Sequence, residues 1–116
     1  MIYIIAGGRD FDNWNYLARV CEKIVLFNKL LPSVIGGGAP GADDLGKQWA
    51  ERHDLFYAEY PADWSQYGKA AGPIRNEEMA QAADGLIAFW DGESRGTKNM
   101  IDTALKHGLE VHIYRY

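Results

Sequence analysis

The sequence predicts an α/β domain in which a parallel sheet lies between two layers of helices. Short apolar segments alternate with segments of helical periodicity along all 116 residues. The unusual glycines and arginines of the chain follow the predicted strands. In a sheet of this kind the loops after the strands meet at one edge, which is where ligands bind.

Composition limits the class of protein. With 47% hydrophobic and 24% charged residues, the chain is typical of one globular domain spanning residues 1–116. Its net charge of −4 argues against nonspecific nucleic-acid binding, which needs clustered Lys and Arg. The single Cys21 indicates a core thiol in a reducing compartment, and no apolar run is long enough to span a membrane. We therefore expect a cytoplasmic protein.

The first strand and helix follow from apolar periodicity and end signals. Ile2–Ala6 is an apolar run that predicts a buried strand. Asp12 or Asn13 is a suitable cap for the next helix, whose apolar stripe continues to about Leu31. Pro32 ends that helix, because the residue before a proline avoids the helical region.

The next segments predict two strands around a glycine-rich turn and a helix. Leu31–Ile35 is short and β-branched, as expected of a buried parallel strand. The glycine-rich turn follows at Gly36–Asp43, and apolar residues then recur at helical spacing over Ala42–Arg52. Leu55–Tyr60 is the third predicted strand.

A long loop precedes the third predicted helix. Ala62–Gly72 is the longest irregular stretch, and its length favours a functional loop over a spacer. Trp64 and Tyr67 within it either cover the base of a ligand or simply pack. Pro73 suits the first turn of the helix that follows.

The remaining segments complete the alternation. They are a strand at Gly85–Trp90, a helix at Asn99–His107 and a strand at Glu110–Tyr114. The sequence therefore predicts a single Rossmann-like three-layer α/β domain with a five-stranded, mostly parallel sheet and about four helices.

The glycine-rich turn is the first candidate for ligand binding. A helix that starts directly after such a turn offers free N–H groups and a positive dipole end to an anion. The alternative is a plain strand-to-helix turn that needs positive φ. Asp43 is either stabilised by the dipole or hydrogen-bonded to a ribose hydroxyl. The candidates are Gly36, Gly37, Gly38, Ala39, Gly41, Ala42 and Asp43.

Other nucleotide and metal signatures are weak or missing. Gly36, Gly38 and Gly41 have the spacing of a dinucleotide fingerprint, but they follow the second strand rather than the first. The turn lacks the Gly-Lys-Ser/Thr ending of a Walker loop, so no ATPase is expected. The three histidines are scattered, with no Cys or carboxylate at ligand spacing. We therefore predict no metal and no bound cofactor.

Three further loops carry candidate ligand-binding residues. Arg9 either holds a phosphate in bidentate fashion or pairs with a nearby aspartate. Arg75 stands at a helix N-terminus, where a cation is locally unfavourable, which favours a functional role with Asn76 beside it. Ser94–Thr97 either contacts phosphate or caps a helix. The candidates are Gly7, Gly8, Arg9, Asp10, Arg75, Asn76, Asp91, Ser94, Arg95, Gly96 and Thr97.

Five segments together resemble the SLOG superfamily, the Rossmann-like group that contains DprA, the Lonely Guy (LOG) phosphoribohydrolases and the YpsA/YspA-related proteins. The short chain is most similar to the YspA-related branch of small bacterial and phage proteins. The resemblance implies binding of a nucleotide or nucleotide derivative, with the glycine turn and the Gly-Thr helix start around its phosphate. The segments are Gly7–Phe11, Gly36–Asp43, Pro73–Asn76, Ala83–Gly92 and Ser94–Thr97.

The resemblance leaves two functions open. The first is a sensor or sequestering module that binds a nucleotide-like small ligand at the C-terminal edge of the sheet. The second is a LOG-type N-glycosidase acting on nucleoside 5′-monophosphates, for which Arg75 matches the catalytic arginine.

The second function lacks its expected carboxylates. The two glutamate positions of the LOG motif are Asn99 and Met100 in this chain. Cleavage through an oxocarbenium-like transition state needs a carboxylate, which Glu93, Asp91 or Asp102 would have to supply. We therefore favour the binding module.

Macromolecular partners are less strongly indicated. DprA-like binding of single-stranded DNA is disfavoured by the acidic balance, and no membrane contact is expected. By analogy with the superfamily, a homodimer or higher homo-oligomer is expected, and the first helix with Phe27 and Leu30 offers an apolar surface for it.

Overall fold

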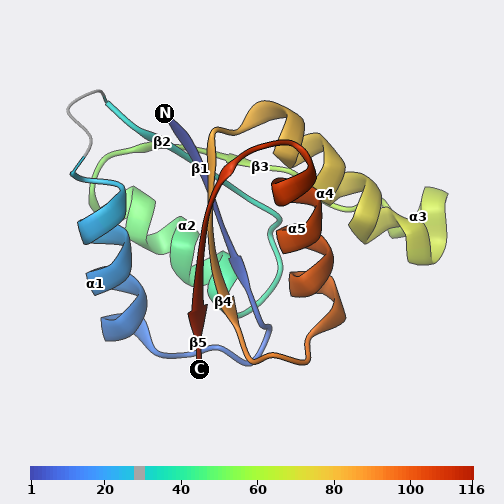
Figure 1. The fold of residues 1–116 in the computed structure, drawn as a ribbon, viewed down its shortest axis with the longest axis horizontal. Coiled ribbons are helices and arrows are strands. Elements are labelled where there is room, and N and C mark those ends of the chain that lie inside the picture. The colour runs from blue at the N-terminus through green and yellow to red at the C-terminus, as the bar shows by residue number, and fades with distance from the viewer. Residues whose placement is uncertain (28–30) are drawn as a thin grey trace.

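A computed structural model describes residues 1–27 and 31–116 and contains a five-stranded parallel sheet (Figure 1). The order across the sheet is β3-β2-β1-β4-β5, so the direction of winding reverses between β1 and β4. This arrangement confirms the predicted Rossmann-like α/β fold. The strands are β1 (Ile2–Gly7), β2 (Ser33–Gly36), β3 (Phe56–Glu59), β4 (Gly85–Trp90) and β5 (Glu110–Arg115).

The helices cover both faces of the sheet (Figure 1). Residues of α1 and α2 pack in one buried cluster, and residues of α4 and α5 pack in another. A short helix and a single 3-10 turn precede α4. The helices are α1 (Trp14–Ile24), α2 (Ala42–Arg52), α3 (Trp64–Tyr67), the turn η1 (Gly68–Ala70), α4 (Ala71–Ala82) and α5 (Arg95–Lys106).

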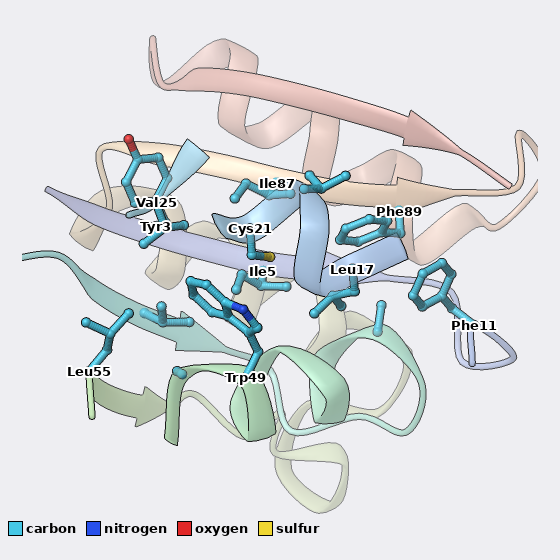
Figure 2. Close-up of a cluster of buried hydrophobic side chains, with 14 residues drawn as sticks. Tyr3, Ile5, Phe11, Leu17, Cys21, Val25, Trp49, Leu55, Ile87 and Phe89 are labelled. Carbon is cyan, nitrogen blue, oxygen red and sulfur yellow. The ribbon is translucent and has the colours of Figure 1, made fainter. Parts of the chain in front are cut away.

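The period-two alternation of β1 assigns its side chains to the two clusters. Tyr3 and Ile5 point toward α1 and α2, where they pack with large side chains such as Trp49 (Figure 2). Ile4 and Ala6 point toward α4 and α5, where alanine and methionine side chains predominate. The face under α4 and α5 is therefore built from smaller or more adaptable side chains.

The first helix is shorter than the sequence predicts. It begins after Asn13, whose side chain accepts the Tyr16 N–H at 3.1 Å, as expected of a cap. It ends at Ile24 rather than near Leu31. Val25, the C-cap, is still buried in the core, but the described apolar residues beyond it are exposed and give a longer helix no packing. Phe27 is 86% exposed and Leu31 is 85% exposed. Leu30, the other residue of the expected dimer surface, lies outside the described residues.

Other element boundaries also differ from expectation: the ends of β1, β2, β3 and β5 shift by one or two residues, and the helices from α3 to α5 differ more. The stretch Ala62–Gly72 is largely helical, because Asp63 accepts the Gln66 N–H at 3.1 Å and starts α3, and α4 already begins at Ala71. Helix α5 begins at Arg95 rather than Asn99. Within the described residues, the helices are too short or too polar to cross a membrane.

Candidate functional site

A cavity of about 630 Å³ lies beyond the carboxyl ends of β1 and β4, where the strand order reverses. Its volume lies within the range of small-molecule sites, roughly 300–1,000 Å³. Its walls combine the loops after β1, β2 and β4 with the α3–α4 region, as the topology predicts. The predicted residues that line it are Gly7, Gly8, Arg9, Asp10, Ala39, Asp43, Arg75, Asn76, Asp91, Ser94, Arg95, Gly96 and Thr97.

The other predicted residues lie beside this main cavity. Gly37 and Gly38 line a second cavity of about 250 Å³, which shares Arg9, Ala39, Trp64 and Arg75 with the first. Gly36, Gly41 and Ala42 line neither of these two cavities.

The glycines of the turn allow close packing of backbone and side chains. Gly41 has φ of 81°, and a Cβ there would collide with the backbone of Gly8 and Arg9. A Cβ on Gly37 would collide with the guanidinium of Arg75. The turn therefore brings the loop after β1 and the side chain of Arg75 close to the start of α2.

The N-terminus of α2 is already occupied by a carboxylate of the chain. Asp43 is 6% exposed, and its Oδ2 accepts the Ala39 N–H at 3.4 Å. Burial raises the pKa of Asp43 to about 6, although Arg75 and the N–H groups of Ala39, Gly7 and Gly37 act in the opposite direction. The Ala42 N–H donates to the Gly8 carbonyl at 3.2 Å, so this helix start offers little to a second anion.

The N-terminus of α5 is built differently. Asp91 Oδ1 accepts the N–H groups of Glu93 and Ser94 at 2.8 Å, which lowers the pKa of Asp91. Ser94 Oγ accepts the Thr97 N–H at 3.4 Å as the cap. Helix geometry leaves the N–H groups of Arg95 and Gly96 without an intrahelical partner. A Cβ on Gly96 would meet nothing within 4 Å, and Ser94, Arg95, Gly96 and Thr97 all line the main cavity.

Two of the three guanidinium nitrogens of Arg75 are hydrogen-bonded within the protein and hold the side chain in place. Its Nη1 donates to the Gly37 carbonyl at 2.7 Å, and its Nε donates to Asn76 Oδ1 at 3.0 Å. Asn76 Nδ2 in turn donates to Asn99 Oδ1 at 2.9 Å. These contacts fix the direction of the side chain and leave Nη2 available toward the cavity wall that Arg75 forms.

Most cationic side chains of the main cavity lack partners within the described part of the protein, whereas its carboxylates have them. Arg9, Lys69 and Arg95 line the cavity, and none of them has a hydrogen bond or ion pair with another described residue. The three carboxylates that line it all accept hydrogen bonds: Asp43 and Asp91 from backbone N–H groups, and Asp10 from Tyr116 Oη at 2.6 Å. The cavity therefore presents unpaired positive charge to a ligand.

Some lining residues carry no clear signal in the sequence. Trp64, named above as a possible base cover, lines both cavities, whereas Tyr67 lines neither. Met79 and Met100 follow the apolar periodicity of core residues, and Lys69 is an unremarkable loop lysine. Among the described residues, no group of three or more His, Cys, Asp or Glu side chains could hold a metal ion.

The fold and the position of the cavity define a Rossmann-like protein with its candidate site at the switch point of the sheet. A family model described as YspA, cpYpsA-related SLOG family matches residues 1–67, which is more than half of the chain. The chain therefore belongs to this family, and the expected membership is confirmed.

Two similar proteins support this assignment. The "Gene 61 protein" of Mycobacterium phage D29 is 42% identical over 84 residues, which cover 67% of each chain. The crystal structure of DNA processing protein A (DprA) from Streptococcus pneumoniae superposes with a TM-score of 0.72 over 97% of this chain, at 19% identity. This chain covers 49% of that DprA chain, and at such low identity the likeness concerns the fold.

Proposed function

We propose that this protein binds a nucleotide or nucleotide-derived small ligand in the main cavity, as a sensor or sequestering module. The observation that carries the proposal is the difference between the charges of the cavity. Arg9, Lys69 and Arg95 are unpaired among the described residues, whereas the lining carboxylates are engaged by donors of the chain. Such a cavity favours an anionic ligand.

The phosphate of the ligand is best accommodated at the start of α5. Arg95 and Gly96, whose N–H groups have no intrahelical partner, line the cavity, and Arg75 Nη2 is available on the same cavity wall. A phosphate has enough acceptor oxygens for backbone and guanidinium donors together. The N-terminus of α2 is the weaker candidate, because Asp43 already lies there.

The less polar part of the ligand fits the apolar part of the cavity lining. Met79 and Met100 are nearly fully buried, and both line the cavity beside Ala6. Trp64 is 52% exposed at the boundary with the second cavity, where its ring is available to a base. The two cavities together have room for a substituent beyond a single nucleotide.

Ligand-observed NMR with nucleoside mono-, di- and triphosphates, NAD and ADP-ribose tests the proposal. We expect saturation transfer to at least one nucleotide, and we expect Arg75→Ala to weaken that binding at least about tenfold, as loss of a charge-assisted contact implies. Arg19→Ala is the matched control, because Arg19 is an exposed arginine on α1. Silence for all nucleotides, or equal loss in both variants, would contradict the proposal.

A LOG-type N-glycosidase is the second candidate, and the carboxylate of Asp43 is the observation that favours it. Asp43 lines the cavity near Arg75, and burial places its pKa at about 6, in the range of a general acid or base. Glu93 and Asp102 do not line the main cavity, and Asp91 is engaged at the start of α5. Release of free base and ribose 5-phosphate that disappears in both Asp43→Asn and Arg75→Ala would establish this candidate.

A further inference from the structure

A chain of hydrogen bonds determines which end of the Asn99 amide faces away from its neighbour. Arg75 carries only donors, so the atom of Asn76 that contacts its Nε at 3.0 Å must be the carbonyl oxygen. The amide nitrogen of Asn76 therefore faces Asn99 and donates to Asn99 Oδ1 at 2.9 Å. Because an arginine fixes the first step, neither amide can be turned around without losing a hydrogen bond.

The free end of this chain belongs to the main cavity. Asn76 is 5% exposed, whereas Asn99 is half-buried and lines the cavity. Asn99 Oδ1 is used by Asn76, and Asn99 Nδ2 has no hydrogen bond with another described residue. Residue 99 therefore offers N–H donors, where a carboxylate at this position would offer acceptors.

The position of Asn99 limits which part of a ligand it can reach. Asn99 lies three residues after Gly96, on the same side of α5 and about 4.5 Å farther along the helix axis. The group that contacts Asn99 is therefore close to a phosphate bound at the start of the helix. Four cationic side chains line the cavity, which is more positive charge than one phosphate needs.

We propose that Asn99 is a specificity-determining donor that binds a second phosphate, so that the cavity selects nucleoside diphosphates over monophosphates. This inference rests on the proposed nucleotide binding. An amide that presents N–H groups cannot take a proton from water, so residue 99 holds an anion and does not act as a base.

Affinities for ADP and AMP, measured by calorimetry at pH 7.5, test the inference. The wild type is expected to bind ADP at least about tenfold more tightly than AMP, by the contribution of one charge-assisted contact. Asn99→Asp presents a carboxylate in the same space and is expected to weaken ADP binding more than AMP binding, so that most of this preference is lost. Asn15→Asp, on the exposed part of α1, is the matched control for the added charge.

Measurements at acidic pH distinguish a ligand-binding donor at residue 99 from an amide with a purely structural role. When the introduced carboxyl group is protonated, it donates again, so the ADP affinity of Asn99→Asp should begin to recover as the pH falls toward the ordinary Asp pKa of about 3.9. The ratio of variant to wild type is the readout, because the variant and the wild type share the ligand phosphates and the other charged side chains of the cavity. These side chains are Asp10, Asp43, Asp91, Arg9, Lys69, Arg75 and Arg95.

A second variant reverses the amide without altering Asn99. In Asn76→Asp the side chain can only accept, so Asn99 must turn its nitrogen toward residue 76 and its oxygen toward the cavity. We expect the same loss of preference for ADP, with the melting temperature kept by the new pair with Arg75. Unchanged selectivity in Asn99→Asp and Asn76→Asp, or a wild type that binds other nucleotides but neither ADP nor AMP, would overturn the inference alone. A wild type that binds none of the nucleotides tested above would overturn the proposed function with it.

Discussion

Helices α2 and α5 both begin beside the main cavity, but their N-termini differ in what occupies them. The start of α2 follows the glycine-rich turn and holds the carboxylate of Asp43, which accepts the Ala39 N–H. The start of α5 follows Asp91–Ser94, and beyond the Ser94 cap its first residues, Arg95 and Gly96, line the cavity with N–H groups that have no intrahelical partner. A run of glycines therefore does not by itself locate an anion site. Our proposal therefore rests on the unclaimed donors at the start of α5.

The largest expected effect is a difference in stability between alanine substitutions at the glycines of the two helix starts. Gly41→Ala places a Cβ against the backbone of Gly8 and Arg9 at a φ of 81°, so we expect a loss of roughly 2–4 kcal/mol of unfolding free energy. Gly96→Ala meets no neighbouring atom and should leave stability unchanged or raise it by up to about 1 kcal/mol. Urea denaturation measures both. Equal destabilisation would remove the distinction between the two turns.

The next effect concerns the pH dependence of stability. The pKa of Asp43 is about 6 in the folded protein, above its usual 3.8, so the folded state holds this proton more tightly than the unfolded state. The contribution of the protonated Asp43 to the free energy of unfolding is fully present below about pH 4 and is lost as pH rises through 6. Relative to Asp43→Asn, the unfolding free energy of the wild type should fall by up to about 3 kcal/mol over this interval. A relative rise with pH would show that the pKa is lowered instead.

The smallest effect concerns the cap of α5. Ser94→Ala removes the acceptor of the Thr97 N–H and should cost about 1 kcal/mol of unfolding free energy. Chemical denaturation measures this cost, and Ser65→Ala is a comparison at an exposed serine that does not cap α3, because Asp63 does. A loss no greater than that of Ser65→Ala would mean that Ser94 does not determine where α5 begins.

Much of the fold and the meeting of the loops could be predicted from the sequence. The strand Gly85–Trp90 and the helix Ala42–Arg52 have the predicted bounds, because each combines a clear apolar pattern with polar or glycine residues at its ends. The loops after β1, β2 and β4 meet because alternating strands and helices impose one topology.

Other features depend on contacts that a local pattern does not contain. The predicted end of α1 was wrong because Leu26 and Phe27 continue the apolar stripe in the sequence but are exposed in the structure. The occupation of the α2 start by Asp43 and the pairing of Asn76 with Asn99 require the packing of distant segments. The ligand-binding roles of the site residues remain predictions.

The most direct test is a two-dimensional ¹H–¹⁵N NMR titration of the wild-type protein with ADP. We expect the largest amide shifts at Arg95 and Gly96, with smaller shifts at Ala39 and Ala42, because the N–H groups of Ala39 and Ala42 already donate to Asp43 and Gly8. Largest shifts at residues 37–42, with residues 95–97 unaffected, would contradict this expectation and return the phosphate to the glycine-rich turn.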